Sequence, residues 1–359
     1  MVKSYYLGGM TPNGFSTKLN ELVDNPNYFT YILKGGPGTG KSSIMKKIAG
    51  EFESAQDVTM FYCSSDPDSL DAIVLNSSKV IIVDGTPPHV FEPLFPGVCQ
   101  KIINLGECWD ESLLQEKKEE IIDAIRQNKS LMKKAAENSN ILGDVCTRRI
   151  KKAEEFINMA KISTFANDFC NEYFYKTCKS KGNLYIRQLS VMTRYGYSTR
   201  LETLKNYENI YVIKDNWFVA ADTLIKLIAE VALEKGLDVR LSNCLLFGTT
   251  VREHLLIDGL NLALISLNPL TKITDSEKKQ IECGDFYDGD SMKEYDGLWL
   301  DNERQINELS DRSAKLLTDA KAAHDEIEKY YIHAMDFAAL DQISDKFIAD
   351  LTAPEGKQV

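Results

Sequence analysis

The 359-residue chain has no arginine before position 126, no CxxC cysteine pair and no long apolar run. A membrane span needs about 18 consecutive apolar residues, and the start MVKSYY lacks the pattern of a secretory signal. The eight cysteines are scattered, without zinc-ligand spacing to histidine, so we expect reduced thiols. These absences exclude a disulfide framework and a membrane span, and they favour a cytoplasmic protein.

The composition is typical of a globular protein that does not bind nucleic acid. The chain is 43% apolar and 26% charged, which is ordinary for a globular protein, and its length suffices for two or three domains. A net charge of −11 argues against a protein that coats nucleic acid or an anionic membrane. Nucleic acid is therefore not an expected partner.

The most informative segment is GGPGTGKS at residues 35–42, which fits the GxxxxGK[ST] phosphate-binding loop. It follows an apolar run at 28–33 and precedes a helix-forming stretch that starts near Lys41, the context in which the motif is meaningful. Glycines let the backbone curl so that amides face phosphate oxygens, and the helix adds its positive end. The alternative is a glycine turn that merely resembles the motif.

These residue types predict a site for a nucleoside triphosphate, ATP, with Mg²⁺. Lys41 is expected to reach the β- and γ-phosphates, and the Ser42 hydroxyl to join the Mg²⁺ shell. The expected nucleotide-binding residues are Gly35, Gly36, Pro37, Gly38, Thr39, Gly40, Lys41, Ser42 and Ser43.

A second segment, KVIIVD at residues 79–84, is a short apolar run that ends in an acid. Such a run is typical of a strand buried on both faces of a parallel sheet. Asp84 would then lie beside the loop and hold the metal through water, as the second acid of such sites does. An incidental acid at the end of a buried strand is the alternative.

Candidates for the catalytic residues, besides Lys41 and Asp84, come from loops after strands, where α/β sheets place ligands. No glutamate follows Asp84, so the usual base of motor-type ATPases is absent. Asp66 follows the expected strand 58–63, although Asp66 before proline also fits a helix cap. His89 lies just past Asp84 and titrates near neutral pH, although a lone histidine is more often structural.

Phosphoryl transfer also needs a positive charge, and the first half of the sequence is poor in arginine. We expect an arginine from the second half of the sequence or from another subunit to complete the site. Without that arginine, hydrolysis should be slow. The candidate arginines are Arg126, Arg148, Arg149, Arg194, Arg200, Arg240 and Arg252.

The sequence is a tandem duplication. MTPNGFSTKL at residues 10–19 aligns with MTRYGYSTRL at 192–201, with six identities in ten, and offsets near 180 persist to GECWD at 106–110 and GDFYD at 284–288. Where the first copy has the glycine loop, the second has DNWFVAAD at 215–222. Bulky residues cannot curl round a triphosphate and acids would repel it, so we predict a single nucleotide site.

Each copy ends in a long stretch with apolar residues at helical spacing. The polar segment NSNILGD at 138–144 is typical of a turn, which predicts an antiparallel helix hairpin. The apolar stripes are expected to form core or a helix seam, and otherwise a surface for a protein partner or self-association. The fold class is therefore α/β, with two tandem P-loop NTPase-like modules of mainly parallel sheets at 1–110 and 183–290 and helical hairpins at 111–182 and 291–359.

With these motifs, the chain resembles an uncharacterised group of bacterial tandem P-loop ATPases. The matching residues lie at 11–14, 33–42, 63–71 and 83–89. The resemblance implies nucleotide binding and hydrolysis but no physiological substrate. In that group the second half looks able to carry its own loop, so the segment at 215–222 is a departure that puts a two-site mechanism in doubt.

Three functions fit the sequence. The first is a Mg²⁺-dependent ATPase whose degenerate half is regulatory or docks a partner. The second is a small-molecule or nucleotide kinase, because the loop also resembles that of nucleoside monophosphate kinases; the scarcity of arginine counts against it. The third is a non-catalytic switch that binds nucleotide, which the missing glutamate after Asp84 favours.

Overall fold

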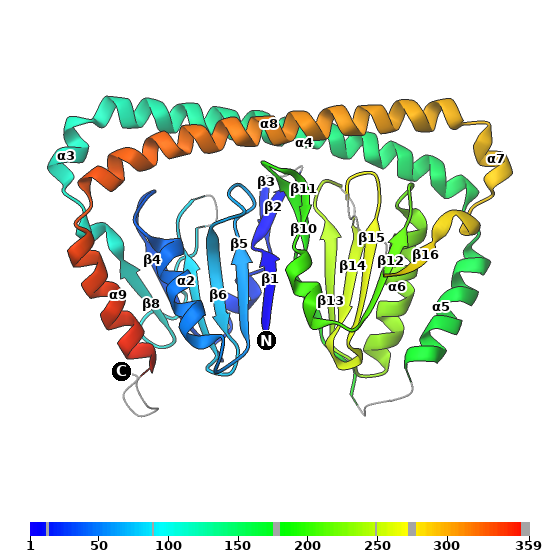
Figure 1. The fold of residues 1–359 in the computed structure, drawn as a ribbon, viewed down its shortest axis with the longest axis horizontal. Coiled ribbons are helices and arrows are strands. Elements are labelled where there is room, and N and C mark those ends of the chain that lie inside the picture. The colour runs from blue at the N-terminus through cyan, green and yellow to red at the C-terminus, as the bar shows by residue number, and fades with distance from the viewer. Residues whose placement is uncertain (12–13, 88–89, 175–179, 248–249, 272–277, 353–359) are drawn as a thin grey trace. The chain divides into compact units, whose positions relative to one another are not determined.

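The computed structural model describes residues 1–11, 14–87, 90–174, 180–247, 250–271 and 278–352 (Figure 1). The chain folds into two compact units, each built from more than one stretch of sequence. The first comprises Met1–Val2, Leu19–Met132 and Thr318–Val359, and the second Lys3–Lys18 and Lys133–Leu317. The units therefore divide the chain differently from the consecutive ranges expected. Among the described helices, none has the length and apolar character that crossing a membrane requires.

The first unit contains β5, β6, β7, β4 and β8 of a six-stranded sheet whose order is β1-β5-β6-β7-β4-β8 (Figure 1). Strand β4 (Phe29–Lys34) lies parallel to β7 (Val80–Asp84) and to β8 (Gln100–Asn104). Strand β6 (Leu70–Leu75) runs antiparallel to β7 and to β5 (Val58–Tyr62), and β1 (Val2–Tyr6) is the edge strand. All of β6 and most of β7 are buried, which explains their apolar sequences.

Helices supply the rest of this core. Helix α2 (Lys41–Phe52) buries Ile44, Met45, Ile48 and Ala49, and α9 (Phe337–Thr352) adds Leu340, Phe347 and Ile348 to the same cluster. The short helices are α1 (Asn20–Val23), the 3-10 helix η1 (Leu105–Cys108) and α3 (Glu111–Glu116). The core of the first unit thus includes the last described helix of the chain.

The second unit has the same strand topology. Its main sheet has the order β16-β12-β15-β14-β13-β9, in which only β14 runs antiparallel to its neighbours. The predicted α/β class with mainly parallel sheets is therefore confirmed. The strands are β9 (Leu184–Ile186), β12 (Asn209–Lys214), β13 (Val239–Cys244), β14 (Val251–Ile257), β15 (Leu262–Leu267) and β16 (Lys279–Glu282).

Two helices and two hairpins accompany that sheet. Helices α5 (Met159–Tyr173) and α6 (Val219–Glu234) belong to its core. The hairpins pair β2 (Gly8–Thr11) with β3 (Gly14–Thr17) and β10 (Ser190–Thr193) with β11 (Gly196–Thr199). The remaining elements are η2 (Glu154–Phe156), η3 (Leu201–Asn206), η4 (Asp258–Leu260), η5 (Cys283–Phe286) and α7 (Gly289–Lys293).

The predicted turn at 138–144, and with it the hairpin built on that turn, is wrong. Helices α4 (Lys118–Ala153) and α8 (Asp296–Ala334) are continuous over 36 and 39 residues, without a turn at 138–144. The Asn138 amide donates to the Leu309 carbonyl (2.7 Å) and to the Ser313 hydroxyl (2.8 Å) on α8. The polar residues that suggested a turn therefore make contacts between helices.

Gly143 has a similar explanation. A Cβ at this position would lie 1.9 Å from the carbonyl oxygen of Leu246, so only glycine lets α4 pass this close to the second unit's own backbone. The glycine that marked a turn in the sequence is instead a point of close packing inside a helix.

Candidate nucleotide site

The loop at residues 35–40 connects β4 to α2. Gly38 and Gly40 have φ angles of 71° and 74°, a left-handed conformation that glycine adopts without steric cost. At Gly35 a Cβ would lie 2.7 Å from Thr39 Oγ1, so the curl leaves no room for a side chain there. The free amides at the start of α2 complete a concave backbone that suits an anion. The glycine pattern thus fits a phosphate cradle.

Lys41 and Asp84 come together beside this loop, as predicted. Lys41 Nζ donates to the carbonyls of Gly35 (2.9 Å) and Gly36 (2.8 Å) and lies 3.7 Å from Asp84 Oδ2. The lysine and aspartate side chains are only 10% and 13% exposed. The sheet accounts for their proximity, because β4 and β7 are adjacent and Leu33 pairs with Asp84.

Ser42 lies on the first turn of α2. Its hydroxyl oxygen accepts a hydrogen bond from the Leu70 amide at 2.9 Å, where β6 begins. A hydroxyl that accepts one bond still has a lone pair for a metal ion. Ser43 is on the exposed side of the same turn. Ser42 therefore faces the acidic end of the sheet, whereas Ser43 points away from the core.

Sequence reasoning missed Asp71. Ala72 pairs with Val83 in the antiparallel register of β6 and β7, so Asp71 falls beside Asp84. Burial, and then the Asp84 carboxylate, hold the pKa of Asp71 well above its usual range, whereas a hydrogen bond with Cys63 and the charge of Lys41 act in the opposite direction. An acid within the apolar segment LDAIVL at 70–75 was the signal that could have found it.

Asp66 lies in the turn between β5 and β6. Its Oδ2 accepts a hydrogen bond from the Ser69 hydroxyl (2.8 Å) and lies 3.5 Å from Lys321 Nζ of α8. The helix that Asp66 was expected to cap is not formed, because the chain turns directly into β6. His89 lies outside the described residues, so its predicted role stays a prediction.

Helix α8 contacts the loop within the first unit. A Cβ on Gly36 would lie 2.7 Å from the Tyr331 ring, and one on Gly38 would lie 2.8 Å from Ile332. On the same helix, Lys321 forms ion pairs with Asp325 and with Glu328 (3.9 Å) and is 16% exposed. The site therefore includes a helix from the far end of the sequence, which no local motif indicated.

The second copy has a shorter loop, because α6 begins at Val219, whereas α2 begins at Lys41, which aligns with Ala221. Phe218 aligns with Gly38 and has a φ of 70°, a conformation that is costly for a bulky residue. Asp222 aligns with Ser42, and its carboxylate accepts a hydrogen bond from the Arg252 amide (2.6 Å), just as Ser42 accepts from Leu70. The two loops thus share these two features, whereas their lengths and sequences differ.

A carboxylate of the protein itself fills the second loop. Asp215 is 1% exposed, and its oxygens accept hydrogen bonds from the amides of Ala221 and Trp217 (both 2.9 Å) and the Tyr287 hydroxyl (3.0 Å). Amides of this kind face phosphate in a P-loop. Because Asp215 already satisfies them, there is a physical reason to expect no nucleotide in the second copy.

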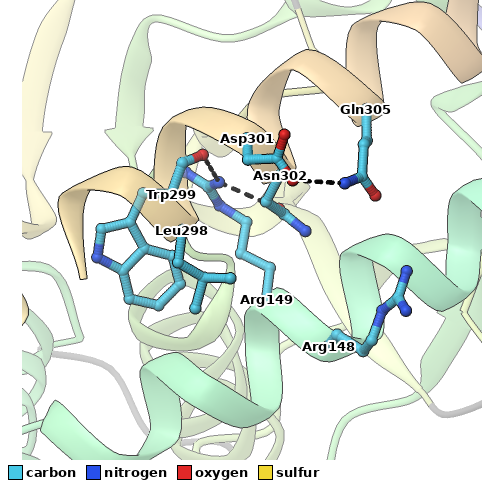
Figure 2. Close-up of a pocket in the computed structure, with 7 residues that line it drawn as sticks. All are labelled: Arg148, Arg149, Leu298, Trp299, Asp301, Asn302 and Gln305. Atoms are coloured by element: carbon cyan, nitrogen blue, oxygen red, sulfur yellow. Dashed lines mark hydrogen bonds between the residues drawn. The ribbon is translucent and has the colours of Figure 1, made fainter.

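Arg149 of α4 closes the second loop from outside. It lines a cavity of about 210 Å³. Figure 2 shows it there with Trp299 and Asn302. Its guanidinium donates to the carbonyls of Asn216 (2.6 Å) and Trp299 (3.1 Å) and to Asn302 Oδ1 (3.1 Å). Burial lowers the pKa of Arg149. This arginine is therefore engaged within the second unit.

Arg126 is the only arginine in the sequence ranges of the first unit. Its guanidinium pairs with Asp123 at 3.0 Å, and both side chains are about three-quarters exposed (75% and 74%). Next to the site aspartates Asp84 and Asp66, the first unit thus has lysines and not this arginine.

No protein-family model matches the chain, and no curated protein or solved structure shows a significant similarity to it.

Proposed function

We propose that the protein binds Mg²⁺-ATP at the loop of the first unit and hydrolyses it, with the second copy serving a regulatory or docking role. The observation that carries this proposal is the curled glycine backbone with Lys41 Nζ between two of its carbonyls and the Asp84 carboxylate. A concave row of amides, a lysine, a hydroxyl and an acid together suit a triphosphate with its metal.

Each residue of the site has a role that follows from its chemistry. The backbone amides of residues 35–42, apart from Pro37, which has no N–H, and the ammonium of Lys41 hold phosphate oxygens. Ser42 with Asp84 would hold Mg²⁺. When bound, Mg²⁺ neutralises charge that develops on the phosphate oxygens. Asp71, buried beside Asp84, is placed to hold a water or a proton at this end of the sheet. Asp66 is instead engaged with Ser69 and Lys321.

Lys321 is our candidate for the positive charge that an arginine was expected to supply. It projects from α8, which packs against the loop glycines, and it ends 3.5 Å from Asp66. Arg149, one of the predicted donors, is committed to the second loop. We expect Lys321→Ala to lower turnover at least tenfold while nucleotide affinity changes less, since the charge acts mainly in the transition state.

Nucleotide binding and phosphate release test the proposal. Lys41→Ala should abolish Mg²⁺-ATP binding in calorimetry, whereas Lys47→Ala should leave it unchanged, because Lys47 is an exposed lysine on the same helix that pairs with Asp345. Phosphate release without an acceptor indicates an ATPase. A labelled acceptor would indicate a kinase, and tight binding with neither would indicate a switch. Absence of binding by the intact protein would refute the proposal.

A further inference from the structure

A second cavity, of about 380 Å³, lies in the first unit next to the glycine loop. Its lining comes from the segment after η1 and from α3, α4 and α8. It combines polar residues, Glu111, Gln115 and Lys118, with apolar and aromatic ones, namely Trp109, Leu114, Ile121, Ile122, Ile125 and Tyr331. This volume falls at the lower end of the roughly 300–1,000 Å³ found for ligand pockets. The cavity is thus large enough for a flat heterocycle and lined to receive one.

Two aromatic rings connect the cavity to the loop. Trp109 and Tyr331 pack edge to face with centroids 5.4 Å apart. A Cβ on Gly36 would lie 2.7 Å from the Tyr331 ring and 3.2 Å from the Trp109 ring, so both rings touch the loop backbone. A ligand held by the loop therefore has this aromatic wall as its immediate neighbour.

The backbone holds the tryptophan in place. The Asp110 amide donates to the Ala334 carbonyl (2.8 Å), and the Asp336 amide donates to the Cys108 carbonyl (2.7 Å). These bonds clamp the residues on either side of Trp109 to the end of α8. The wall is consequently a fixed part of the first unit.

We propose that this cavity is the subsite for the base of the nucleotide and that it selects purines. The inference rests on the proposed function, because the loop must first hold the phosphates. Aromatic side chains bind bases by stacking, and a larger base gains more contact with them. The Glu111 carboxylate and the Gln115 amide at the same cavity offer groups that can hydrogen-bond the edge of the base.

The second copy supports this assignment. The residue aligned with Trp109 is Tyr287, and its ring packs edge to face on Trp217 with centroids 4.8 Å apart. Trp217 aligns with Pro37 of the first loop. In the second copy, the loop that Asp215 closes therefore also supplies an aromatic residue, Trp217, that packs on Tyr287. The first copy has proline there, so its loop carries no aromatic side chain at this position, and Trp109 packs on Tyr331 of α8 instead.

The test compares ATP with tripolyphosphate, which has the phosphates but no base. In calorimetry with Mg²⁺, the wild-type protein should bind ATP at least tenfold more tightly than tripolyphosphate, and ATP or GTP at least tenfold more tightly than UTP. Trp109→Ala should weaken ATP binding about tenfold and leave tripolyphosphate affinity unchanged. Trp109→Phe, which keeps a ring, should retain most of the ATP affinity.

The possible outcomes separate the two proposals. If ATP and tripolyphosphate bind equally well to the wild type, or if UTP matches ATP, the purine subsite is refuted while the phosphate site stands. An equal loss of both ligands in Trp109→Ala would also refute it, since the tryptophan would then only support the loop. If the wild type binds neither ligand, the proposed function itself fails.

Discussion

Single residues distinguish the two loops. In the first copy the glycines leave the amides free, and Lys41 bonds to two loop carbonyls. In the second copy Asp215 takes those amides for its own carboxylate. Burial raises the pKa of Asp215, while the hydrogen bonds from the amides of Ala221 and Trp217 act in the opposite direction. A buried carboxylate is retained because its hydrogen bonds compensate for lost hydration.

Asp215→Ala should therefore destabilise the protein substantially. The change leaves buried amides and the Tyr287 hydroxyl without their acceptor, at about 1–3 kcal/mol for each group. We expect the free energy of unfolding to fall by at least about 3 kcal/mol in urea titrations. The control is Asp168→Ala, an exposed aspartate of the same unit, with a loss below about 1 kcal/mol. Equal losses in both variants would contradict the structural role of Asp215.

Glu253 predicts a pH dependence of stability. Burial raises the pKa of Glu253 to about 7, although Tyr197, Asn268 and Thr271 donate hydrogen bonds to it. Because the pKa is higher in the folded state, its contribution is full below about pH 4.5 and is lost as the pH rises through about 7. The loss amounts to about 3 kcal/mol.

Glu253→Gln should remove this pH dependence, which urea unfolding at several pH values from 4.5 to 8 would measure. As the pH rises, the unfolding free energy of the wild type should fall relative to that of the variant. Glu282→Gln, an acid that is 60% exposed, serves as control and should show a much smaller change. A difference that stays constant across the range would show that Glu253 is not the responsible group.

At the scale of elements, the sequence predicted strands and loop better than helices. The buried strands β4 and β7 and the loop between β4 and α2 carry local signals, namely apolar runs and glycines with defined φ. The continuity of α4 carries no local signal, since Asn138 and Gly143 are turn formers in isolation. Both residues remain helical because of their tertiary contacts with Ser313 and with the Leu246 carbonyl. Asp71 was missed for the same reason, because its neighbour Asp84 is close only in the sheet.

Gly143→Ala tests this explanation of α4. Alanine normally stabilises a helix interior by about 1 kcal/mol relative to glycine. At position 143 the added Cβ would lie 1.9 Å from a backbone oxygen, so we expect a loss of at least about 2 kcal/mol instead. Gly50→Ala in α2 is the matched control, since a Cβ there meets nothing within 4 Å, and it should stabilise. Thermal unfolding of both variants would reveal whether the signs differ; stabilisation by both would refute the close contact.

At the scale of the whole molecule, each unit takes one of its core helices from the other copy's stretch of sequence. Helix α5 follows the first copy yet belongs to the core of the second unit, through Ile162 and Phe169. Helix α9 follows the second copy yet contributes Leu340 and Phe347 to the core of the first. Phe169 and Phe347 align in the repeat, so the exchange is the same in both directions. The duplication therefore did not produce two self-sufficient consecutive domains.

A fragment of residues 1–182 should consequently fail to fold, although it contains the complete glycine loop at 35–42. It lacks Leu340, Phe347 and Ile348, and the loss of buried side chains of this size costs about 2–5 kcal/mol each, against a typical total stability of about 5–15 kcal/mol. Circular dichroism and Mg²⁺-ATP calorimetry should show no cooperative unfolding and no binding, and co-expression with residues 183–359 should restore both. In the full chain, Phe347→Ala should lower the melting temperature and the exposed Phe337→Ala of the same helix should not. A fragment that melts cooperatively and binds nucleotide as the intact chain does would show that the first copy is an independent domain after all.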